Sequence, residues 1–111
     1  MKTEDIGLVP IEINLAAAEK GDLSEDYLGQ FGAIMKLLMS SVMNGYNTPF
    51  RIRGSKSSLS KFAKVVGSEK RYMETFNKYG LNHKTTYASK YKLDKAVRDF
   101  ERSTGLKWPF K

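Results

Sequence analysis

Hydrophobic and polar positions in the first part of the chain predict a strand followed by a long helix. Apolar residues alternate with polar ones from Leu8 to Leu15, which is the spacing of a β-strand. Pro10 cannot donate a ladder hydrogen bond, so the strand begins near it or lies at a sheet edge. Ser24 is a suitable N-cap for a helix that we expect to run to about Met43, because acidic residues follow it directly.

The apolar side chains of this helix cover most of its circumference. Met35, Met39 and Met43 follow one another at a spacing of four residues, which places them on one stripe. A small domain needs one helix buried on most sides, so ordinary core is the favoured interpretation of the stripe. Methionine surfaces also serve adaptable interfaces, which makes the stripe a candidate homodimer surface.

The second half of the chain predicts a second strand and three helices. Phe50–Arg53 alternates and is expected to pair with Ile11–Asn14. The expected helices run from Ser57 or Ser58 to Gly67, from Ser68 to Tyr79 and from about Ser89 to Thr104. We therefore predict one mainly α domain spanning residues 1–111, with α+β as the open alternative: a compact four-helix fold with a short two-stranded pairing. Its expected core residues are Ile13, Phe31, Ile34, Leu38, Val42, Phe62, Val66, Met73, Phe76, Leu93, Val97 and Phe100.

The amino-acid composition excludes several classes of function. The chain has 111 residues, 41% of them hydrophobic, and no cysteine, which excludes thiol catalysis, disulfides and thiolate metal sites. His83 is the only histidine and has no partner at ligand or triad spacing, so we expect a surface histidine, no metal, no cofactor and no enzymatic activity. Neither a signal peptide nor a membrane span is evident, and we expect a cytoplasmic protein.

Charge is divided unevenly between the two halves. Residues 1–49 hold three Lys and Arg against seven Asp and Glu, whereas residues 50–111 hold sixteen against five, for a net charge of +7. Such asymmetry indicates an anionic partner, and nucleic acid is the leading candidate because neutralised phosphates release counterions.

One segment has the spacing of a helix-turn-helix unit. From Leu59 to Phe76, small and apolar residues surround a turn expected at Gly67. The second helix would offer its first residues to base edges: Ser68, Glu69, Lys70, Arg71 and Glu74. A plain helical hairpin, or a hairpin that serves another interface, explains the same spacing.

Basic and aromatic residues alternate through the last two expected helices. Tyr79, Tyr87 and Tyr91 either stack on unpaired bases or join the core, and both interpretations stay open. Arg51 and Arg53 form a positive corner that either holds a phosphate or protects a sheet edge against aggregation. The candidate nucleic-acid-binding residues are Arg51, Arg53, Lys61, Lys64, Lys70, Arg71, Lys90, Lys92 and Lys95.

Two stretches carry a resemblance to a known group of proteins. Residues 67–81, GSEKRYMETFNKYGL, and residues 92–111, KLDKAVRDFERSTGLKWPFK, resemble small uncharacterised proteins encoded by tailed bacteriophages. The resemblance covers about the last 60 residues and implies a phage accessory protein that acts inside an infected bacterium, on DNA, RNA or host machinery.

These observations favour a nucleic-acid-binding accessory or regulatory protein that uses a basic helical face. The first alternative is an inhibitor or adaptor that docks on an acidic host protein, with Tyr87, Tyr91 and Trp108 as anchors. The second alternative is a virion component that assembles through the methionine stripe.

Overall fold

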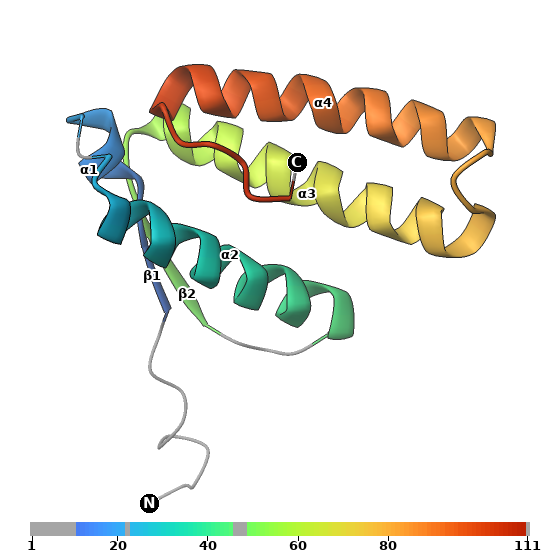
Figure 1. Ribbon diagram of the computed structural model, residues 1–111, viewed down its shortest axis with the longest axis horizontal. Helices are drawn as coiled ribbons and strands as arrows, with labels where there is room; N and C mark the ends of the chain where they lie inside the picture. Colours follow the sequence, from blue (N-terminus) through green and yellow to red (C-terminus); the bar gives the residue numbers. More distant parts are fainter. Residues whose placement is uncertain (1–10, 22, 46–48, 111) are drawn as a thin grey trace, which may run out of the picture.

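The computed structural model describes residues 11–21, 23–45 and 49–110. Its elements follow the order β1 (Ile11–Asn14), α1 (Leu15–Glu19), α2 (Glu25–Asn44), β2 (Phe50–Arg53), α3 (Lys56–Tyr79) and α4 (Lys84–Thr104). The long helices α3 and α4 lie antiparallel, and α2 crosses below them (Figure 1). The expectation of a mainly helical fold with four helices and two paired strands is confirmed.

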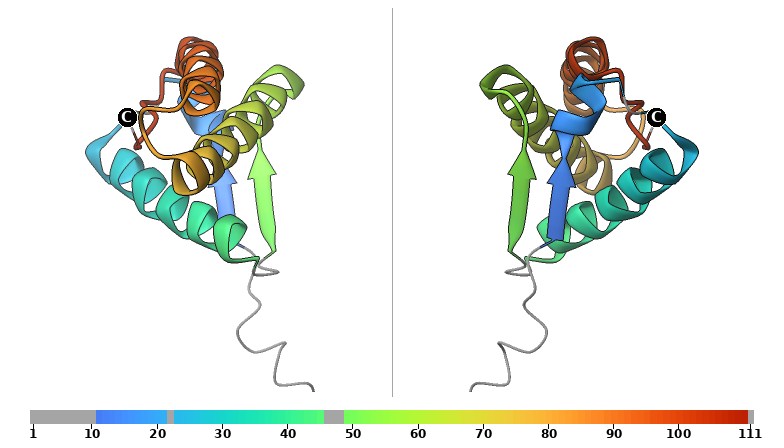
Figure 2. Two further views of the ribbon diagram at one scale, coloured as in Figure 1. Left: turned by 90° about the vertical axis from the view of Figure 1, so that its right-hand side faces the viewer. Right: turned by 90° about the vertical axis from the view of Figure 1, so that its left-hand side faces the viewer.

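The two strands pair in parallel, with Ile11 opposite Phe50 and Ile13 opposite Ile52. Figure 2 shows their arrows side by side and pointing the same way. Residues 8–10 of the expected strand lie outside the described residues. The expected alternation does not continue to Leu15, which instead begins α1, because the Asn14 side chain accepts a hydrogen bond from the Ala17 amide at 3.3 Å and caps the helix.

Helix α3 is continuous, so the turn expected at Gly67 is wrong and the segment 59–76 contains no helix-turn-helix. The helical period of buried positions carries on past this glycine, since Phe62, Val65, Glu69 and Thr75 are all buried. A single glycine costs a helix about 1 kcal/mol, which the packing of both flanking turns exceeds. The hairpin turn lies instead between α3 and α4, where Gly80 takes a φ of 85°.

Capping explains where the helices begin and end. Ser24 caps α2 as expected, and Gly105, with a φ of 80°, ends α4. Ser55, rather than Ser57 or Ser58, caps α3. Helix α4 begins at Lys84, five residues before the expected start near Ser89, and His83 caps it: its Nδ1 accepts a hydrogen bond from the Thr85 amide at 3.1 Å.

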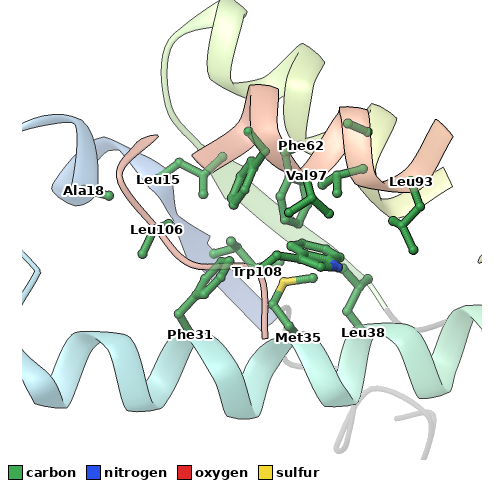
Figure 3. Close-up of a cluster of buried hydrophobic side chains, with 14 residues drawn as sticks. Leu15, Ala18, Phe31, Met35, Leu38, Phe62, Leu93, Val97, Leu106 and Trp108 are labelled. Atoms are coloured by element: carbon green, nitrogen blue, oxygen red, sulfur yellow. The ribbon is translucent and has the colours of Figure 1, made fainter. Parts of the chain in front are cut away.

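The core lies between α2, the α3–α4 pair and the C-terminal segment. That segment folds back between the α3–α4 pair and α2, as Figure 3 shows for Leu106 and Trp108. The Trp108 indole stacks edge to face on Phe100, with ring centroids 5.7 Å apart. Burial of the aromatic and aliphatic side chains here joins all the helices into one unit.

Most of the expected core residues are buried, and one is not. Ile34, Val42 and Val66 are half-buried against the core cluster, and Met73 is half-buried. Phe76 is 44% exposed, because it lies on the distal part of α3, which extends past the end of α2 (Figure 1).

The methionine stripe belongs to the core rather than to the surface. Met35 and Met39 are buried, and only Met43 at the end of α2 is partly exposed. A homodimer through this stripe would require these side chains to leave the interior, so the fold does not offer it as a dimer surface.

Candidate nucleic-acid interface

The acidic residues of α3 and α4 are largely committed to structural contacts. The two helices hold twelve Lys and Arg against five Asp and Glu. Glu74 pairs with Lys70 at 3.1 Å and Asp94 pairs with Lys90 at 3.0 Å, each one helical turn apart. Glu69 and Glu101 accept hydrogen bonds from the indole and the backbone amide of Trp108. These four carboxylates are therefore not available to pair with the remaining cations of the hairpin.

Two adjoining hollows lie between α3 and α4, with volumes of about 220 and 100 Å³. They share Arg71, Ser89 and Lys92, and Lys64 borders the larger one. No described acidic residue lines either hollow. We call this surface the basic groove; its residues are Ala63, Lys64, Gly67, Ser68, Arg71, Thr85, Ala88, Ser89 and Lys92.

Helical spacing brings the cations of the basic groove together. Lys64 and Arg71 are seven residues apart on α3, so they project from one face, and Lys92 projects from the facing side of α4. The residues between them, including Gly67 and Ala88, are small. They leave the floor of the groove low and let the cationic side chains stand above it.

Polar contacts inside the hairpin fix the register that creates the groove. The Thr75 and Ser89 hydroxyls lie 2.8 Å apart, and both side chains are buried. Thr86 donates to the carbonyl of Gly80 at 2.7 Å and closes the turn. These contacts set Arg71 beside Lys92.

The basic groove has the chemistry of an anion site. Lys64, Arg71 and Lys92 are exposed, and none of them pairs with a described carboxylate. An Arg guanidinium binds phosphate oxygens with two parallel hydrogen bonds, and each Lys adds a point charge. Lys95 is exposed three residues beyond Lys92 on α4 and extends the positive surface.

The other candidate lysines are less available. Lys61 is half-buried and donates to the Ser57 hydroxyl at 3.2 Å. Lys70 and Lys90 are paired with acids, and the Lys90 ammonium also lies 5.6 Å from the centre of the Tyr72 ring. The structure therefore does not gather all the predicted lysines into one surface.

The expected corner for a phosphate near β2 already contains carboxylates. Glu12 on β1 lies 4.0 Å from Arg51 and 3.6 Å from Arg53. Glu19 accepts hydrogen bonds from the Ser55 amide at 3.0 Å and from the Ser58 hydroxyl at 3.1 Å, at the start of α3. Its hydrogen bonds with Ser55, more than any other influence, lower the pKa of Glu19. The Glu19 carboxylate thus occupies the helix start where we expected a phosphate. Neither Arg51 nor Arg53 lines a hollow of the basic groove.

Two of the three expected aromatic anchors are on the surface. Tyr87 is 58% exposed and Tyr91 is 69% exposed, so they do not join the core. Trp108 is 3% exposed, and the expectation that it anchors a partner is wrong because the C-terminal segment buries it. Tyr79, also exposed, stacks on His83 with ring centroids 4.4 Å apart.

Sequence reasoning missed two glutamates that organise the fold. Glu19 accepts a hydrogen bond from the amide of Ser55, the N-cap of α3, 36 residues away. Glu69, expected to face base edges, is buried beside Trp108. The only signal for Glu69 was its place on the apolar face of a helix that continues through Gly67. This face could not be recognised while a turn was expected at Gly67. Glu19 carried no local signal, because its partners lie on another element.

Comparisons with known proteins assign no family to the chain. Neither protein-family models, curated proteins nor solved structures give a match. In the described part of the chain, no helix has the length and apolar character needed to cross a membrane. Within residues 11–21, 23–45 and 49–110, no cluster of three or more His, Asp or Glu residues is placed to hold a metal ion.

Proposed function

We propose that this protein is a nucleic-acid-binding accessory or regulatory protein whose basic groove receives the phosphate backbone. The observation that supports the proposal is the convergence of Lys64, Arg71 and Lys92 on hollows that no described acid lines. A polyanion releases condensed counterions when these cations replace them, which supplies affinity without reading sequence. Without a helix-turn-helix unit, the binding mode is contact along the hairpin surface rather than insertion of a recognition helix.

Exposed tyrosines on α4, outside the lining of the basic groove, favour strands with unpaired bases. Tyr87 and Tyr91 are four residues apart on α4, which separates them by about 6 Å along the helix axis. This distance exceeds the rise of about 3.4 Å per nucleotide in a duplex strand, so each ring would receive its own base from an extended strand. Stacking on an aromatic side chain is worth about 1 to 3 kcal/mol per base.

The salt dependence of binding tests the proposal. If Lys64, Arg71, Lys92 and Lys95 each neutralise one phosphate, the logarithm of the association constant for duplex DNA should fall with log salt at a slope of about −3 to −4. Fluorescence anisotropy with labelled duplex and single-stranded oligonucleotides measures this slope. Undetectable binding at low salt, or a slope near zero, would contradict the proposal.

A second candidate function has support at the hairpin turn. Phe76, Tyr79 and Leu81 expose apolar surface there, at 44%, 42% and 57% of their areas. An inhibitor or adaptor that docks on an acidic host protein would use such side chains as anchors and the lysines around them for steering. Pull-down from bacterial lysate separates the two candidates: a specific protein retained after nuclease treatment supports the adaptor, and loss of all partners supports nucleic acid.

A further inference from the structure

A second cavity lies on the side of α3 opposite the basic groove. Its volume is about 480 Å³, within the range of small-molecule sites. It is open to solvent on one side and is lined by the end of α2, the distal half of α3 and the C-terminal segment. Its apolar walls are Met43, Tyr72, Met73, Phe76 and Phe110, and its polar side chains are Asn77 and Glu69.

The Glu69 carboxylate lines this cavity with one oxygen bonded to the protein and the other accessible from the cavity, since no buried side-chain oxygen of the described residues lacks a hydrogen-bond partner. Glu69 as a whole is only 3% exposed, and its Oε1 accepts a hydrogen bond from the Trp108 indole at 2.7 Å. This bond is the only one that a described residue makes to the carboxylate, although a carboxylate accepts about four. Burial, the dominant influence, raises the pKa of Glu69, against the opposing effects of the indole and the Lys90 charge.

The aromatic walls of the cavity add a second source of attraction for a cation. The rings of Tyr72 and Phe76 are 6.2 Å apart and inclined by 56°, and Phe110 lies edge to face on Trp108. Ring faces attract ammonium groups, and Tyr72 already has the Lys90 ammonium 5.6 Å from its centre. Lys90 is held by Asp94 at 3.0 Å rather than by Glu69.

We propose that this cavity binds a small organic ammonium ion with an apolar body. The ammonium group donates a hydrogen bond to the free oxygen of Glu69, and the apolar body contacts Met43, Met73 and Phe110. Charge-assisted hydrogen bonds are stronger than neutral ones, so the site selects a cation although the whole protein is positive. This ligand class is separate from the phosphates proposed for the basic groove.

A matched pair of probes tests the charge requirement. Cyclohexylmethylammonium and cyclohexylmethanol have nearly the same shape and differ in charge. Trp108 is the only tryptophan of the chain and touches Glu69, so its fluorescence reports occupancy. We expect saturable binding of the ammonium probe and binding of the alcohol that is weaker by about tenfold or more. Equal affinities, or no saturable response to either probe, would overturn the proposal.

Two variants assign the effect to this cavity. Glu69→Gln keeps an oxygen for the indole and removes the charge, so the preference for the ammonium probe should disappear. Phe76→Ala removes an aromatic wall residue and should weaken both probes, the ammonium probe more strongly because the ring also attracts its charge. Thermal unfolding verifies that each variant is folded. A folded Glu69→Gln variant that keeps the tenfold preference, or unaltered binding by Phe76→Ala, would refute the assignment.

Discussion

Glu69 and Glu19 are acidic side chains with opposite environments. Glu69 is enclosed by apolar groups and shares one hydrogen bond with Trp108, so removal from water dominates and its pKa rises. Glu19 is exposed, and the hydrogen bonds that it accepts from Ser55 dominate, so its pKa falls. The pH dependence of stability should therefore carry opposite contributions from these two residues.

The raised pKa of Glu69 predicts how its contribution changes with pH. Above the ordinary value of about 4.5, the unfolded chain loses this proton first, so the folded state binds more protons and stability falls as pH rises through the raised pKa. Thermal unfolding of the wild type and of Glu69→Gln at several pH values measures the effect. The melting temperature of the wild type, relative to the variant, should decrease as pH rises above about 4.5. A constant or increasing difference would contradict this explanation.

At the scale of elements, the sequence predicted regular structure better than its interruptions. Alternation found both strands, and Ser24 and Gly105 marked real helix ends. Gly67 was misread because a glycine inside a helix and a glycine at a turn look alike locally. The tertiary contacts on both sides of it decide between them.

The basic groove required information that no single segment contains. Its cations come from two helices, and which of them meet depends on the position of the turn at Gly80 and on the Thr75–Ser89 contact. The sequence analysis named Lys64, Arg71 and Lys92 as candidate binding residues, but it could not predict that they converge. The exposure of Phe76 was unpredictable for a similar reason, because it depends on where α2 ends relative to α3 (Figure 1).

Replacement of Gly67 by alanine should stabilise the protein. A Cβ at this position has no neighbouring atom within 4 Å, and alanine favours a helix by about 1 kcal/mol over glycine. Chemical denaturation should show an increase of about that size in the free energy of unfolding. Gly105→Ala is the control, because its φ of 80° is strained for alanine and stability should fall. Destabilisation by Gly67→Ala would contradict a continuous α3.

Tyrosine substitutions on α4 separate base stacking from phosphate binding. The double variant Tyr87→Leu and Tyr91→Leu keeps every cation of the basic groove and removes two aromatic faces. We expect at least a tenfold loss of affinity for single strands, from about 1 to 3 kcal/mol per stacked base, with little change for duplex. Competition between labelled single strands and duplexes in anisotropy measures the selectivity. Equal losses for both would show that the tyrosines do not receive unpaired bases.

At the scale of the whole molecule, the charge asymmetry corresponds to a division of structural roles. The acidic first half supplies Glu12, which pairs with the arginines of β2, and Glu19, which holds Ser55 and Ser58 at the start of α3. The basic second half supplies the hairpin, where most acids are engaged and one surface is left positive. The positive charges are thus unevenly distributed over the surface. Their location, rather than the net charge of +7, supports the proposed function.

The most direct test compares two triple variants of equal charge. Lys64→Gln, Arg71→Gln and Lys92→Gln remove the cations of the basic groove, whereas Lys20→Gln, Lys36→Gln and Lys107→Gln remove three exposed lysines from other parts of the surface. Salt-dependent anisotropy with one oligonucleotide measures both. We predict that the groove variant reduces the magnitude of the salt slope by about 3 and loses most affinity, while the control stays close to the wild type. Equal losses in the two variants would show that net charge alone, and not the basic groove, attracts the nucleic acid.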